Sequence, residues 1–300
     1  MYSQELPASK TLAESRIELL KQLGALEASR INPLDFRGVS GFSDEEIVED
    51  ARKVENKRLV IAEKIEQMSP AQKSINEDGR IVESLLRACI REASWLGKDT
   101  RLILPSLFDD YFRGIDMITE FSKDPTDPRH IGFGVDFTIA SEELAHKLTG
   151  IIKSVSDGFA PSVKYFESPV LGKRKNVWMP KVVLAADYQS VKRVADAFVE
   201  ARSNGRPVKG ILENDPLQFV LLDEVRGQLT AFRNIAYEMY GNKKAGGLYH
   251  RALMSFLDML EEKGLTKDVL EKGSRGDSLH GRILSMIGKF DREYSPKTNS

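Results

Sequence analysis

Two aspartates interrupt apolar, β-like segments in the middle of this 300-residue chain. Asp116 lies in residues 115–121 and Asp136 in residues 132–140. A carboxylate inside so apolar a strand is costly to bury unless something pairs with it. The two segments predict a hairpin that brings both carboxylates within reach of one ion, and hard divalent cations such as Mg²⁺ take oxygen ligands of this kind. Buried arginines or backbone donors could satisfy the same two acids without any metal.

Further acids could belong to the same site. Glu83 lies in a predicted helix and either faces the sheet or lies on the surface. Asp109 and Asp110 just precede the first aspartate segment and belong either to the site or to a loop, which we favour. Glu120 shares a strand face with Asp116 and could extend the acidic cluster.

Two lysines could supply positive charge beside these acids. In the predicted helix 141–157, Lys147 falls on the flank of the apolar face and can reach back to the sheet, whereas Lys153 points nearly opposite and is expected in solvent. Lys164 lies on the next predicted strand, residues 162–166, and is a second candidate. A cation at either position could stabilise developing negative charge.

A basic run of Lys173, Arg174 and Lys175 follows Gly172. We expect a loop here, which is either a solvated turn or a phosphate-contacting loop, because lysine and arginine make most contacts to nucleic-acid backbones. The four histidines lack metal-ligand spacing. The chain also lacks the phosphate-binding loop of ATPases and the nucleophile elbow of α/β hydrolases.

The elements that would position these residues form an α/β unit over residues 80–205. The pattern predicts helices at 80–96, 141–157 and 190–202, and strands at 100–104, 115–121, 132–140, 162–166 and 181–186. That order predicts a small mixed β-sheet flanked by helices. Residues 1–79 form a helical N-terminal extension, with helices at 11–28 and 43–68. Residues 206–300 form a helical C-terminal region, with helices at 217–240, 247–263 and 277–293.

Composition excludes several classes of protein. The net charge of −1 gives no electrostatic argument that the chain binds nucleic acid. The chain contains no run of 18 apolar residues, so the sequence predicts no membrane-spanning helix. The single cysteine, Cys89, lies in an apolar run, which indicates a buried, inert thiol and a reducing, cytoplasmic setting. We expect no membrane partner.

The helix with Glu83, the strands with Asp116 and Asp136, and the following helix and strand together resemble the PD-(D/E)XK nuclease superfamily over about 120 of the 300 residues. The resemblance implies a restriction-endonuclease-like core in which Asp116, Asp136 and the backbone carbonyl of Phe137 bind Mg²⁺ or Mn²⁺, with Glu83 assisting. The lysine that the family places two residues after the second acid is Thr138 here. Because members of the superfamily tolerate migration of this lysine, Lys147 or Lys164 would replace it.

Two functions follow from this resemblance. The first is a Mg²⁺-dependent nuclease that hydrolyses phosphodiester bonds in DNA, with the helical extensions clamping substrate or joining copies of the chain. The second, favoured by Thr138, is an inactive nuclease-like module that binds nucleic acid or protein. If the protein has a purely structural role, buried arginines or backbone donors would have to pair with the aspartates in the apolar strands.

Overall fold

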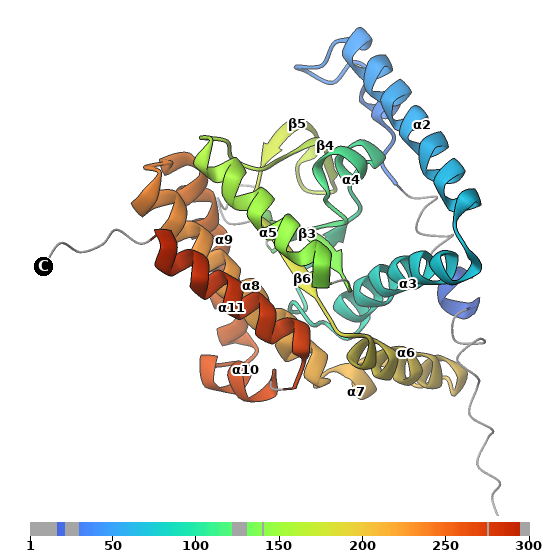
Figure 1. The fold of residues 1–300 in the computed structure, drawn as a ribbon, viewed down its shortest axis with the longest axis vertical. Helices are drawn as coiled ribbons and strands as arrows, with labels where there is room; N and C mark the ends of the chain where they lie inside the picture. The colour runs from blue at the N-terminus through green and yellow to red at the C-terminus, as the bar shows by residue number, and fades with distance from the viewer. Residues whose placement is uncertain (1–16, 22–29, 122–130, 140, 275, 295–300) are drawn as a thin grey trace, which may run out of the picture.

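The computed structural model describes residues 17–21, 30–121, 131–139, 141–274 and 276–294. Figure 1 shows a small sheet enclosed by helices, with α2 projecting from the rest of the molecule. The N-terminal half of the chain contributes a 3₁₀ turn (Pro33–Phe36), α2 (Asp44–Gln67), α3 (Pro70–Glu92), β1 (Arg101–Ile103), α4 (Leu107–Arg113), β2 (Met117–Glu120) and β3 (Ile131–Thr138). The remainder contributes α5 (Ser141–Ser156), β4 (Ser162–Ser168), β5 (Gly172–Trp178), β6 (Lys181–Ala185), α6 (Tyr188–Ser203), α7 (Val208–Leu212), α8 (Pro216–Asn234), a π-helical turn (Ile235–Met239), α9 (Lys243–Glu262), α10 (Lys267–Gly273) and α11 (Ser278–Tyr294).

The prediction of a small mixed sheet with flanking helices is confirmed. Strands β1, β2 and β3 form an antiparallel meander, and β6 pairs with β3 in parallel, giving the order β1-β2-β3-β6. A parallel pair needs a long crossover connection. Helix α5 and the β4–β5 hairpin lie in that connection, and α5 packs against both β3 and β6.

The loop predicted around Lys173, Arg174 and Lys175 is wrong, because these residues lie in β5. Strand β5 pairs with β4 as a separate antiparallel ribbon, with Phe166 opposite Arg174. Along β5, exposed residues alternate with partly buried ones, so charged side chains fit an edge strand with one wet face. The short helices α4, α7 and α10 were also not predicted. Of the helix predicted at 11–28, residues 17–21 are helical and the rest lies outside the described residues.

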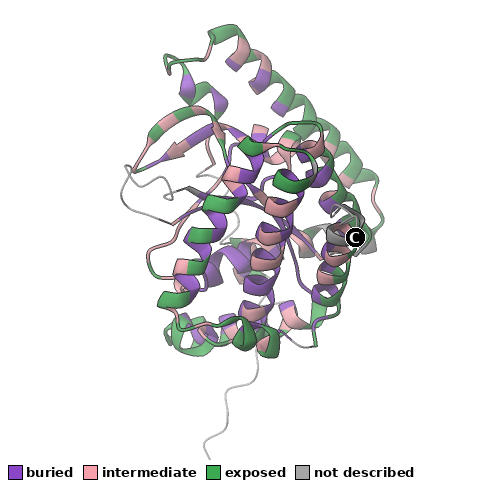
Figure 2. Ribbon diagram, turned by 90° about the vertical axis from the view of Figure 1, so that its left-hand side faces the viewer, coloured by how far each residue is buried: buried purple, intermediate pink, exposed green. Residues whose placement is uncertain are grey.

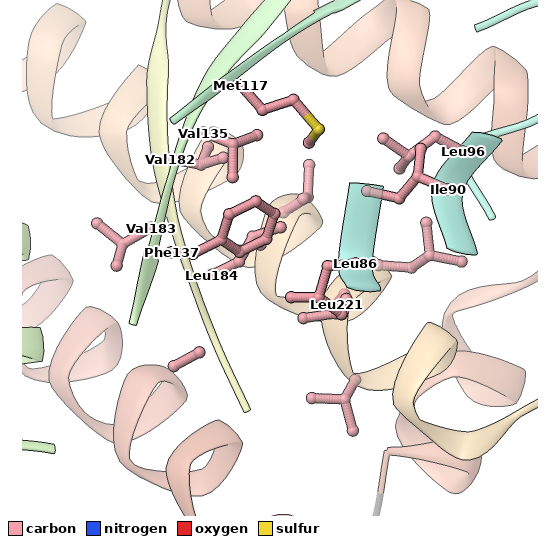
Figure 3. Packing of buried hydrophobic residues seen from close by; sticks show 14 of the residues in the cluster. Leu86, Ile90, Leu96, Met117, Val135, Phe137, Val182, Val183, Leu184 and Leu221 are labelled. Carbon is pink, nitrogen blue, oxygen red and sulfur yellow. The ribbon is translucent and has the colours of Figure 1, made fainter. Parts of the chain in front are cut away.

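The main hydrophobic core lies between the sheet and helices from both halves of the chain. In Figure 3, Val135 and Phe137 of β3 lie beside Val182 of β6, while Leu86 of α3 and Leu221 of α8 approach the same core. Figure 2 shows buried residues along the inner sides of the central helices. Residues after 205 therefore share one apolar core with the sheet. Cys89 is buried in this core, and burial raises the pKa of its thiol well above the usual value, as expected for an inert cysteine.

The outer edge of β6 is covered by polar side chains from α8 and α9. Gln228 accepts a hydrogen bond from Val183 N (2.8 Å) and donates to Val183 O (2.5 Å). Glu224 accepts from Ala185 N (3.0 Å), and the Tyr249 hydroxyl donates to Lys181 O (3.2 Å). These side chains satisfy backbone groups that a neighbouring strand would otherwise satisfy.

A second polar cluster anchors α11 to α8. His280 Nε2 lies 3.3 Å from Asp223 Oδ2, and His280 Nδ1 lies 3.6 Å from Glu224 Oε1. Burial opposes protonation of His280, but these two carboxylates outweigh it and raise the pKa of the imidazole to about 9. Burial raises the pKa of Glu224 to about 7.

Within the described ranges, no helix combines the length and the apolar character that crossing a lipid bilayer requires.

Candidate functional site

Asp116 and Asp136 lie opposite each other at one end of the β2–β3 hairpin. The register pairs Met117 with Val135, so the next residues outward are Asp116 and Asp136. Asp116 Oδ2 accepts a hydrogen bond from Phe137 N (2.6 Å), and Asp116 N donates to Val135 O (2.7 Å). Both carboxylates are buried. Like charges directly across a ladder repel, so this arrangement requires cations nearby.

Two lysines supply that charge at Asp136. Lys147 Nζ lies 2.6 Å from Asp136 Oδ1 and 2.7 Å from Phe137 O. Lys181 Nζ lies 2.7 Å from Asp136 Oδ2 and 3.0 Å from Arg113 O. Lys147 thus reaches the sheet, as its position on the flank of α5 predicts. No local pattern predicts the position of Lys181, because its proximity to Asp136 depends on the parallel pairing of β6 with β3.

Glu83 faces the sheet from α3 and interacts with Arg87. Arg87 Nη2 lies 3.3 Å from Glu83 Oε2 and donates to the backbone oxygen of Asp116 (2.7 Å). Of the two positions considered for Glu83, the structure therefore has the sheet-facing one. Burial raises the pKa of the Glu83 carboxyl, and the positive charge of Arg87 partly offsets this effect.

Asp110 lies in α4 rather than in a loop, and it forms an ion pair with Arg30. The pKa of Asp116 lies well above its usual value, first because of burial and then because of the charges of Glu83, Asp136 and Asp110. Three of these carboxylates pair with cations: Glu83 with Arg87, Asp110 with Arg30, and Asp136 with Lys147 and Lys181. A carboxyl with so strongly raised a pKa in a cavity wall is a candidate for binding a cation or exchanging a proton. Asp109, also in α4, has a structural role instead. Its carboxylate accepts from the backbone N–H groups of Lys164 (2.6 Å) and Tyr165 (3.0 Å).

Thr138 carries no charge to the site at the position where the resemblance implies a lysine. Its hydroxyl lies 3.4 Å from Glu143 Oε2 on the first turn of α5. The ammonium nearest to Asp136 instead comes from Lys147, about two helical turns into α5.

The second candidate lysine, Lys164, lies in a different cluster. Its ammonium forms ion pairs with Asp50 and with Glu46 of α2, the latter at 2.7 Å. The Tyr165 hydroxyl also donates to Asp50 Oδ2 (2.9 Å). These contacts fix the N-terminal part of α2 to the β4–β5 hairpin, so the ammonium of Lys164 pairs with acids of α2 and not with Asp116 or Asp136.

The basic residues of β5 also bind protein groups. Lys173 Nζ donates to Asp35 O (2.7 Å), and Lys175 Nζ donates to Gly41 O (2.7 Å) and pairs with Glu46. Arg174 Nε donates to Leu171 O (3.1 Å).

Glu120 lies apart from the acidic cluster. Its carboxylate oxygen Oε2 lies 3.9 Å from Arg101 Nη1 on β1.

Two cavities meet at Lys147. We call the first the acidic cavity: it measures about 410 Å³, and its charged lining residues are Glu83, Asp116, Glu143 and Lys147. The second, the basic cavity, measures about 580 Å³ and includes Arg113, Asp136, His146, Lys147 and Lys181 in its lining. Among the residues that line these two cavities, Lys147 alone is shared.

The donor set at this point consists of oxygens. Asp116, Asp136 and the Phe137 carbonyl are ligands that suit a hard cation such as Mg²⁺, which usually takes one or two carboxylates and keeps several waters. The described residues contain no group of three or more His, Cys, Asp or Glu side chains arranged to hold a metal. A divalent cation therefore fits these residues only as a water-rich ion with few protein ligands, and it would share Asp136 Oδ1 and Phe137 O with Lys147.

The sequence matches no protein-family model, and neither curated proteins nor solved structures show a significant match to this chain.

Proposed function

We propose that this chain is a Mg²⁺-dependent nuclease that hydrolyses phosphodiester bonds in DNA. The observation that carries the proposal is the convergence of Asp116, Asp136 and the ammonium of Lys147 at one end of the β2–β3 hairpin. The order of the core elements also supports it. The chain order runs from helix α3 through the meander β1-β2-β3 and helix α5 to the parallel strand β6, and this is the order that a restriction-endonuclease-like core would require.

In this proposal, Asp116, Asp136 and the Phe137 carbonyl hold the metal, and Glu83 assists from α3. When bound, such a metal would supply an activated water and charge stabilisation at the phosphate oxygens. Lys147 takes the role of the absent strand lysine. Because its ammonium borders both cavities, it can face a phosphate beside the carboxylates and stabilise the negative charge that develops there. Lys181 holds the second oxygen of Asp136 and so fixes the orientation of that carboxylate.

Cleavage assays of the Asp136→Asn variant test the proposal. Plasmid and single-stranded DNA would be incubated with Mg²⁺ or Mn²⁺, and EDTA should stop all cleavage. The variant keeps the size of the side chain but loses its charge, so we expect the cleavage rate to fall by at least about 100-fold. Asp196→Asn is the matched control, because Asp196 is an exposed aspartate of α6 that lines neither cavity. Full activity of Asp136→Asn would exclude the assignment.

The second candidate function is a nuclease-like module that binds nucleic acid or protein without cleaving it. It is favoured by Thr138 in the place of the expected lysine, and by the two lysines that occupy both oxygens of Asp136. Binding of DNA that EDTA does not change, with no cleavage in either metal, would support this function over the first.

A further inference from the structure

The basic cavity carries positive charge where the acidic cavity carries negative charge. Arg113, His146, Lys147 and Lys181 line this cavity together with Asp136. Lys147 and Lys181 pair with Asp136, whereas Arg113 Nε lies 3.5 Å from Asp109 Oδ1. Arg113 is held in place, because its guanidinium donates to the backbone and hydroxyl oxygens of Ser162 at 2.6 and 2.7 Å. A fixed group of cations beside the proposed catalytic residues is complementary to a phosphodiester backbone.

One exposed aromatic side chain lines the same cavity, and two others belong to residues adjacent to its lining. Phe112 lines it and is 46% exposed, and its ring lies 5.1 Å from that of Phe108, centroid to centroid. Trp178 is 41% exposed and pairs across the β4–β5 ladder with Ser162, which also lines the cavity. The ammonium of Lys244 lies over the Trp178 ring, 3.3 Å from its centroid, so Phe112 is the better stacking candidate. Phe159 is 65% exposed and immediately precedes the lining residue Ala160. The three rings come from three separate segments, so local sequence alone does not explain their position.

Exposed aromatic rings beside a cavity that could bind phosphates should give paired and unpaired nucleic acid different binding affinities. In a duplex, the bases stack on one another and present only their edges in the grooves. An unpaired strand presents the faces of its bases, and stacking on an aromatic side chain contributes to binding whatever the base. The combination of cations and aromatic faces therefore favours an unpaired strand.

We infer that the basic cavity binds the phosphates of an unpaired nucleic-acid strand, with a base stacked on Phe112. This inference rests on the proposed function, since it names the substrate class that would enter the same site. It assigns the phosphates to Arg113 and Lys181 and places the strand so that it passes Lys147 toward the carboxylates.

Fluorescence anisotropy with labelled oligonucleotides of one sequence tests the inference. The probes are single-stranded DNA, single-stranded RNA and the corresponding DNA duplex, and EDTA is present so that binding requires neither metal nor cleavage. We expect wild type to bind at least one unpaired strand about 10-fold more tightly than the duplex. The DNA and RNA probes show which sugar the cavity accepts.

Two variants of Phe112 then separate stacking from packing. Phe112→Leu keeps an apolar side chain but removes the ring, and we expect it to weaken single-strand binding by about 10-fold. Phe112→Tyr keeps the ring and should bind as wild type does. Tyr188→Ala is the matched control, because Tyr188 is an exposed aromatic residue of α6 that does not line the cavity.

Equal affinity for duplex and unpaired strands, or unchanged binding by Phe112→Leu, would overturn the inference. Metal-dependent cleavage of duplex DNA by the same protein would then leave the proposed nuclease function intact. Conversely, Phe112-dependent binding of unpaired strands without cleavage would contradict the nuclease function and support the binding site.

Discussion

The ammonium of Lys147 lies between Asp136 Oδ1, at 2.6 Å, and the backbone oxygen of Phe137, at 2.7 Å. These are two of the three groups assigned to the metal in the proposed nuclease. The carboxylate of Asp136 and the charge of Asp116 keep Lys147 protonated, raising the pKa of its ammonium despite partial burial. A permanent cation thus lies where the resemblance implies positive charge, although it comes from a helix and not from the strand.

Replacement of Lys147 tests its role directly. We expect Lys147→Met to lower kcat for DNA cleavage by roughly 100-fold, because an ammonium that stabilises transition-state charge is lost. Lys153→Met is the matched control, since Lys153 lies on the same helix and is exposed. Steady-state cleavage of a labelled substrate in Mg²⁺ measures both variants. Equal activity of Lys147→Met and Lys153→Met would remove Lys147 from the catalytic assignment.

Replacement of Lys164 should affect stability rather than cleavage. Lys164→Met removes the cation that pairs with buried Asp50, so we expect the free energy of unfolding to fall by about 2 kcal/mol. Urea unfolding measures this loss. Cleavage per folded molecule should stay within about twofold of wild type. Lys173→Met is the control, because Lys173 is more exposed and should change stability by about 0.5 kcal/mol or less. Loss of cleavage at full stability would instead place Lys164 in the site.

Asp116→Asn should abolish activity while making the protein more stable. The pKa of Asp116 is raised by burial and by neighbouring carboxylates, so its ionisation costs folding free energy. That cost is absent below about pH 4, the pKa of an unfolded aspartate, and grows as the pH rises through the folded pKa. The variant keeps an oxygen that can accept from Phe137 N. We therefore expect a gain of about 1 kcal/mol at neutral pH that disappears in acid.

Thermal unfolding in EDTA, followed from pH 4 to pH 8, measures this difference. Glu143→Gln controls for the loss of one negative charge near Lys147. A variant that is less stable than wild type throughout this range would show that the charge of Asp116 is well compensated without metal.

The His280 cluster predicts a loss of stability at alkaline pH. Because the folded pKa of His280 is about 9 and the unfolded value about 6.5, its contribution is fully present below pH 6.5 and is lost as the pH rises through 9. Groups that act on this cluster are Asp223, Glu224 and Arg226 of α8, and Asp277 at the start of α11.

We expect wild type to lose roughly 2 kcal/mol between pH 6.5 and pH 9.5, and His280→Gln to lose much less. Unfolding of both proteins in urea across this range measures the difference. Parallel pH profiles for the two proteins would contradict protonation of His280 in the folded state.

The core of the site follows from simple periodicity. Alternation along two apolar segments identified Asp116 and Asp136, and the antiparallel register places them opposite each other. The 100° spacing of helix α5 identified Lys147 and rejected Lys153. These relationships are local, because each depends on one strand, one helix or one hairpin.

The partners that come from distant segments could not be predicted in this way. Lys181 reaches Asp136 only through the parallel pairing of β6 with β3, and Arg30 reaches Asp110 across 80 residues. The charged residues of β5 have a low strand preference and so predict a loop, but pairing with β4 outweighs that preference. Neither pairing partner is visible in the local sequence.

Helices α8 and α9 act as a substitute for a fifth strand. Gln228, Glu224 and Tyr249 satisfy alternate backbone groups along the outer side of β6. In a chain that ended before Pro216, the backbone N–H and C=O groups on that side of β6 would be unpaired, and a strand of another molecule could pair with them. Residues after Pro216 therefore protect the sheet from polymerising, and a chain truncated at residue 205 should form aggregates rather than a folded α/β unit.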